Sequence, residues 1–68
     1  MRHIVIHDAE EGGYWAEVPS LPGCVSEGET LDEVVSNIKE AIDLYVEGLI
    51  EDGQPVPDDE PVRVIVQS

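Results

Sequence analysis

Residues 30–53 carry the start and stop signals of one long helix. Residues 30–33 match a capping box, in which the Thr30 oxygen accepts from the backbone N–H of Glu33. The Glu33 carboxylate is expected to reach back to the N–H of Thr30. Gly53 stands where a C-terminal helix glycine belongs, and the two prolines that follow prevent the helix from continuing. We therefore predict a helix from about residue 31 to residue 51.

This helix is amphipathic. Its apolar residues recur at steps of three and four, which builds one broad apolar face: Leu31, Val34, Val35, Ile38, Ala41, Ile42, Tyr45, Val46 and Leu49. Leu44 and Ile50 lie off this stripe and are either isolated exposed side chains or protein contacts. A helix with one apolar face needs another layer to cover it, so the rest of the chain has to supply a sheet.

Three β segments precede the helix. In residues 2–7 the alternation places Ile4 and Ile6 on one face and His3, Val5 and His7 on the other. Residues 8–13 are polar, end in two glycines and predict a hairpin loop, so residues 14–18 form an antiparallel second strand. Tyr14, Ala16 and Val18 are expected to face the core, with Trp15 and Glu17 facing away. Residues 19–23 form a proline-containing turn, and residues 24–27 are a short third strand.

Residues 62–66 follow a connection rich in proline and aspartate and predict a last strand. Its alternation is broken by Ile65, as expected for a strand that is covered on both faces or that pairs with another chain. The order is β-β-β-α-β. We predict an α+β fold in which a three-stranded antiparallel meander, one helix and a final strand make a single domain over residues 1–68.

The charge is strongly one-sided. There are 16 acidic side chains against three basic ones, Arg2, Lys39 and Arg63, and the net charge is −13. Such a field repels nucleic acid and anionic membranes, and it attracts a basic protein. The alternative is that acidity only keeps a small protein soluble. The lone Cys24 excludes an intrachain disulfide, and no signal peptide or membrane-length apolar run is present, so we expect a cytoplasmic protein.

The residue types that support catalysis are present but poorly arranged for it. Most carboxylates fall at positions predicted to face solvent, whereas acid–base catalysis needs them to converge in a cleft. His3 and His7 share a strand face but would lie about 13 Å apart, too far to share a metal ion. Cys24 has no evident activating base, and no glycine-rich phosphate loop precedes the helix. We predict no catalytic, metal or cofactor site and no enzymatic activity.

The resemblance to a known family rests on residues 14–24, on Ser26 and Gly28, on the capping box with the helix beyond it, and on the linker at residues 53–57. Together these closely resemble the HicB-like antitoxin family, in which a strand ends in a proline-leucine-proline-glycine-cysteine turn before a capped helix. The resemblance covers nearly the whole chain. The resemblance implies a partial ribonuclease H-like fold that lacks the catalytic carboxylates. It also implies a partner, HicA, which is a small basic toxin that cleaves messenger RNA. The residues that we interpret as the structural motif are Pro19, Pro22, Gly23, Cys24, Thr30 and Glu33.

Many HicB proteins carry a C-terminal DNA-binding domain, and we expect none here, because the sequence ends at Ser68. Direct nucleic-acid binding and operon repression by this chain alone are therefore not expected. The alternatives are a stand-alone interaction module with another partner, or a metal-dependent nuclease on the same fold. We expect toxin contacts at Trp15 and Glu17 on the outward strand face and at Ser20 and Leu21 in the projecting turn, with Trp15 the strongest candidate. The small core, Trp15 and the valine-rich last strand also predict a homodimer or larger assembly.

Overall fold

A computed structural model describes residues 2–56 and 62–67. Strands β1 (Arg2–Asp8), β2 (Tyr14–Glu17) and β3 (Val25–Gly28) precede a single long helix, α1 (Leu31–Glu51), and strand β4 (Val62–Gln67) follows it. The predicted β-β-β-α-β order and the α+β class are confirmed, and each element begins and ends within about one residue of its predicted bounds. No helix in the described ranges is long and apolar enough to cross a membrane.

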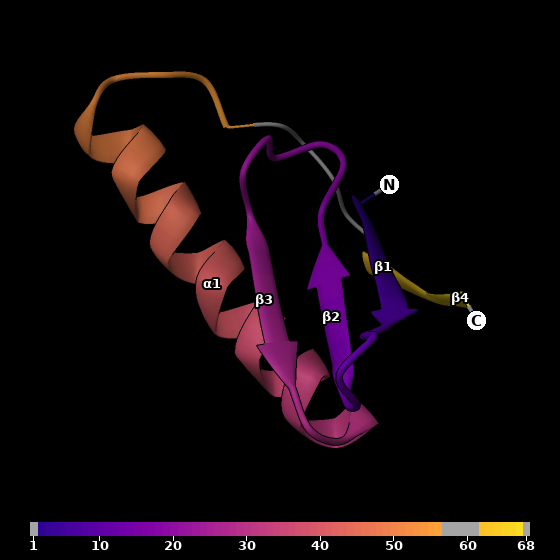
Figure 1. Ribbon diagram of the computed structural model, residues 1–68. Coiled ribbons are helices and arrows are strands. Elements are labelled where there is room, and N and C mark those ends of the chain that lie inside the picture. The colour runs from indigo at the N-terminus through magenta and orange to yellow at the C-terminus, as the bar shows by residue number, and fades with distance from the viewer. Residues whose placement is uncertain (1, 57–61, 68) are drawn as a thin grey trace.

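The four strands form one open sheet in the order β3-β2-β1-β4. The meander β1-β2-β3 is antiparallel, as predicted, with His7 opposite Trp15 and Trp15 opposite Glu27. β4 pairs in parallel with β1, with Ile4 beside Val64. A parallel neighbour requires a crossover connection, and α1 provides it. Figure 1 shows the helix lying across one face of the sheet, with β4 at the edge remote from β3.

Both ends of α1 are capped by local hydrogen bonds. Thr30 Oγ1 accepts from the backbone N–H of Glu33 at 3.1 Å, which confirms half of the capping box. The other half is wrong: the Glu33 carboxylate accepts from the N–H of Glu29 at 3.2 Å, one residue before the expected donor. At the C-terminus Gly53 has φ 72°, and the N–H of Gln54 donates to the carbonyl of Leu49 at 2.9 Å. This is a Schellman motif, which glycine in the left-handed region makes possible.

The core lies between α1 and the facing side of the sheet. Among the residues that the structure describes, it consists of nine buried side chains: Ile4, Ile6, Ala16, Val18, Leu21, Cys24, Val34, Ile38 and Ile42. The predicted inward and outward faces of β1 and β2 are confirmed. On α1 the predicted apolar stripe holds except at Leu31, which is 41 % exposed because it opens the first turn, at the margin of the packed layer. Leu44 and Ile50, off the stripe, are exposed.

Gly28 fixes how closely α1 approaches the sheet. A Cβ atom at this position would lie 2.5 Å from the backbone nitrogen of Val34 and 2.9 Å from the Cβ of Glu33. Glycine at the end of β3 therefore lets the first turn of the helix pass directly over the strand. This contact, together with packing against β2, places α1 over the β3–β2 half of the sheet.

Candidate functional site

The sheet face turned away from α1, here called the outer face, carries the residues available for recognition. The strand registers place on it the side chains that alternate with the core residues: His3, Val5, His7, Trp15, Glu17, Val25, Glu27, Arg63, Ile65 and Gln67. Trp15 is 37 % exposed and Val25 is 58 % exposed. The outer face therefore combines apolar and charged side chains, and within residues 2–56 and 62–67 no helix covers them.

Three side chains on the outer face form one ordered cluster. The imidazole of His7 stacks on the indole of Trp15, with ring centroids 4.2 Å apart and planes 17° apart. The same imidazole lies 2.8 Å, through Nε2, from the carboxylate Oε2 of Glu17. Because both contacts hold the rings in place, the indole is presented to solvent in a fixed orientation. A partly exposed tryptophan that stacks on a histidine beside a carboxylate is well suited to protein recognition.

A shallow hollow lies next to this cluster and is lined by Trp15, Val25, Ser26 and Glu27. One flank is aromatic and aliphatic, and the other bears a carboxylate. Such a surface fits a partner side chain that has an apolar stem and a cationic end, because the stem can pack on the indole while the charge meets the glutamate.

The turn between β2 and β3 corrects one prediction. Its backbone makes two consecutive turns, with the N–H of Leu21 donating to the carbonyl of Val18 and the N–H of Cys24 donating to the carbonyl of Leu21, both at 2.9 Å. This path folds the middle of the turn back toward the core, so Leu21 is 1 % exposed. The expectation that Leu21 projects toward a partner is wrong. Ser20, next to it, is exposed as predicted.

The proline and glycine residues of the turn lie on its solvent side. Pro19, Pro22 and Gly23 are exposed, and Gly23 has φ 84°, in the region that favours glycine. The hydroxyl of Tyr45, on α1, donates to the carbonyl of Pro22 at 2.9 Å. The helix therefore holds the turn through the Tyr45 hydrogen bond, and the buried side chain of Leu21 packs the turn against the core. These two contacts fix the conformation of the turn that follows Glu17.

Cys24 is buried at the end of this turn. Burial raises the pKa of its thiol above the usual value, and the positive charge of Arg2 opposes this rise. The neutral thiol is therefore favoured, which is typical of a packing residue. In the described part of the chain no three His, Cys, Asp or Glu side chains are grouped to hold a metal ion, and His3 and His7 lie on the outer face of β1 as predicted.

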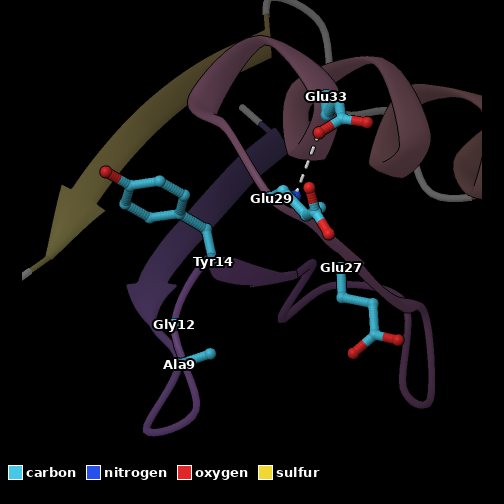
Figure 2. A pocket seen from close by; sticks show the side chains of 7 residues that line it. Ala9, Gly12, Tyr14, Glu27, Glu29 and Glu33 are labelled. Atoms are coloured by element: carbon cyan, nitrogen blue, oxygen red, sulfur yellow. Dashed lines mark hydrogen bonds between the residues drawn. The ribbon is translucent and has the colours of Figure 1, made fainter.

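A second hollow opens where the β1–β2 loop meets the start of α1, and it is lined in part by Glu27, Glu29 and Glu33 (Figure 2). The dashed line in Figure 2 is the hydrogen bond between the N–H of Glu29 and the carboxylate of Glu33. These carboxylates extend the acidic character of the outer face around the end of the sheet. Glu33 itself is engaged in capping the helix.

Sequence reasoning placed His7, Trp15 and Glu17 on one face but did not connect them. The missing information was the hairpin register, which brings His7 directly opposite Trp15 and diagonal to Glu17. His7 is thus a functional candidate that the sequence analysis missed. Pairing the two strands outward from Asp8 and Tyr14, which flank the loop, would have placed His7 opposite Trp15.

Comparison with known proteins bears on all of these elements. Residues 3–68 match the model of a family described as the HicB_like antitoxin of bacterial toxin-antitoxin systems. A UPF0150 protein of Synechocystis sp. is 42 % identical, over 93 % of this chain and 85 % of its own length. A UPF0150 protein of Thermoplasma acidophilum is 39 % identical over the full length of both chains.

A third relative, an uncharacterized 14.9 kDa protein of Haemophilus phage HP1, is 46 % identical over 75 % of this chain. The match covers 38 % of the phage protein, so only part of that protein corresponds to this fold. The family model, in contrast, takes in all four strands, the turn that buries Leu21 and the capped helix. The chain belongs to the HicB-like antitoxin family of bacterial toxin–antitoxin systems.

Proposed function

We propose that this protein neutralises a basic, HicA-like toxin in the cytoplasm by covering the surface with which the toxin binds messenger RNA. The observation that carries the proposal is the ordered His7–Trp15–Glu17 cluster on an uncovered sheet face of a strongly acidic protein. Family membership supports a role in a toxin–antitoxin system in general. The toxin as partner and the outer face as its contact are inferred from the chemistry of that face.

The mechanism is occlusion. A toxin that binds RNA presents cationic groups to phosphates, and carboxylates on a folded protein compete for the same groups. Long-range attraction between the acidic antitoxin and the basic toxin accelerates their encounter. Once the charges have oriented the two proteins, the exposed indole of Trp15 supplies an apolar contact that stabilises the complex. No covalent step is required.

The test uses the purified chain and a purified HicA-like toxin, which we expect to be a short basic protein encoded next to this one. We expect association by calorimetry at low salt, weakening as salt rises, and loss of the toxin's RNA cleavage as the complex forms. Trp15→Ala is expected to weaken binding at least tenfold. Leu44→Ala, at an exposed apolar position on α1, serves as the matched control and is expected to bind normally.

Two results would contradict the proposal. One is the absence of association at low salt with such a toxin. The other is binding that Trp15→Ala and Glu17→Gln leave unchanged, which would place the contact elsewhere. In the first case the fold would serve another partner, as a stand-alone interaction module.

A further inference from the structure

We propose that the hollow lined by Trp15, Val25, Ser26 and Glu27, here called the Trp15 hollow, receives an arginine side chain of the partner. The guanidinium stacks on the indole of Trp15 and pairs with the carboxylate of Glu27. This inference rests on the proposed function for the identity of the partner. It adds the chemistry of the side chain that the partner inserts.

The Trp15 indole is covered on one face and open on the other. The imidazole of His7, on β1, stacks on the ring with 4.2 Å between the centroids. Because β2 lies between β1 and β3, the opposite face of the ring is turned toward β3, where Val25 also lines the hollow. Trp15 is 37 % exposed, so this face is accessible to a partner. A flat group laid on it would extend the stack of two rings by a third layer.

Glu27 is the carboxylate beside the indole that is left to bind a partner. Glu17 already lies 2.8 Å from the imidazole of His7, whereas in the described part of the chain the Glu27 side chain has no hydrogen bond or ion pair. Its backbone carbonyl accepts the side-chain amide of Asn37 at 2.8 Å, and it lies directly opposite Trp15 in the β2–β3 register. The backbone that carries this carboxylate is therefore held next to the indole.

The surroundings of the Trp15 hollow select a cation. A neighbouring hollow shares Trp15 and Glu27 with it and is also lined by Asp8, Glu10 and Glu11 at the first hairpin. Among the described residues, no lysine or arginine lines either hollow. The local potential is therefore negative, which attracts a cationic side chain and repels an anionic one.

The geometry of the hollow favours arginine over lysine. A guanidinium is planar and weakly hydrated, so it can lie flat on an aromatic ring while the N–H groups at its edge pair with a carboxylate. A lysine ammonium is compact and strongly hydrated, and it has no flat face to present to the indole. Arginine can thus contact Trp15 and Glu27 at once, with its methylene groups packed near Val25.

Two capped peptides, tetra-arginine and tetra-lysine, test this site without the toxin. Both carry the same positive charge, so their long-range attraction to a chain of charge −13 is the same. By calorimetry at low salt we expect the arginine peptide to bind about threefold more tightly, the gain that one exposed cation–π contact supplies. The arginine peptide should also change the fluorescence of Trp15 more strongly than the lysine peptide does.

Three variants assign the preference to the hollow. Glu27→Gln and Trp15→Ala are each expected to bring the affinities for the two peptides together. Glu40→Gln removes the same charge from an exposed position on α1, so it should weaken both peptides alike and keep the preference for arginine. Circular dichroism verifies that all three variants are folded. Equal affinities of the wild-type protein for the two peptides, or a preference that survives in both Glu27→Gln and Trp15→Ala, would overturn the proposal.

The peptide experiment and the toxin experiment fail independently. A toxin that does not associate contradicts the proposed function, while a preference for the arginine peptide would still support the arginine site. A toxin that binds through Trp15, together with peptides of equal affinity, overturns the arginine site alone.

Discussion

The imidazole of His7 lies parallel to the indole of Trp15 across the first hairpin, with 4.2 Å between the ring centroids. Trp15 is the only tryptophan in the chain, so its fluorescence reports this single contact. His7 belongs to β1 and Trp15 to β2, and the stack therefore also ties the two strands together on the side of the sheet that α1 does not cover.

His7→Ala is expected to move the emission of Trp15 to longer wavelength, because water replaces the ring that covers one face of the indole. The loss of this cross-strand pair should cost about 0.2–1 kcal/mol in the free energy of unfolding. His3→Ala is the control, since His3 lies on the same strand and the same face but outside the cluster. An unchanged emission spectrum in His7→Ala would contradict the stacked geometry.

Leu21→Ala is expected to destabilise the protein by about 2–5 kcal/mol, because it removes a fully buried side chain from beneath the turn. Urea denaturation measures the change. Val25→Ala truncates an exposed aliphatic side chain nearby and should have a small effect. A Leu21→Ala protein of normal stability that had lost only its partner would support the original expectation that this leucine makes the contact.

Gly28→Ala and Gly48→Ala form a matched pair with opposite expected signs. A Cβ at Gly28 meets the backbone of Val34 at 2.5 Å, so the helix must shift and the protein is destabilised. A Cβ at Gly48, inside α1, meets nothing within 4 Å. Alanine there should stabilise the protein by about 0.5–1 kcal/mol, because it restricts the unfolded chain and favours the helix. Thermal unfolding of both variants tests the pair.

Cys24 predicts a dependence of stability on alkaline pH. Burial raises the pKa of its thiol in the folded state above the value of 9.0 for an exposed thiol. Between these two pKa values the folded state binds more protons than the unfolded state, so stability falls as pH rises beyond about 9. In Cys24→Ala this component of the slope should be absent, although its stability at neutral pH is also lower. Parallel slopes for both proteins above pH 9 would refute the prediction.

The sequence determines the elements well because their signals are local. The capping threonine, the three- and four-residue apolar spacing and Gly53 lie within one helix, and the alternation in β1 and β2 assigns inward and outward faces without knowledge of the fold. Thus Ile4 and Ile6 were predicted inward, and Trp15 and Glu17 outward, as the structure has them.

What was missed depends on contacts between distant segments or on the path of a turn. Leu21 was expected to be exposed because loops usually run on the surface, whereas two tight turns direct it inward. The stack of His7 on Trp15 requires the hairpin register. The exposure of the β4 valines depends on which strands α1 covers. That in turn depends on the strand order β3-β2-β1-β4, which no local sequence pattern indicates.

The parallel pairing of β4 with β1 has a consequence for the nascent chain. Among the described strands β1 is made before the others, and β4, which pairs with its second edge, is made about sixty residues later, after the whole helix. During translation β1 can pair with β2 alone, and its other edge stays available to the ribosome surface, to chaperones or to proteases. Closing so long a loop has an entropic cost, which is offset only when β4 pairs with β1. Protection of β1 from proteolysis should therefore appear late in synthesis and in a single step.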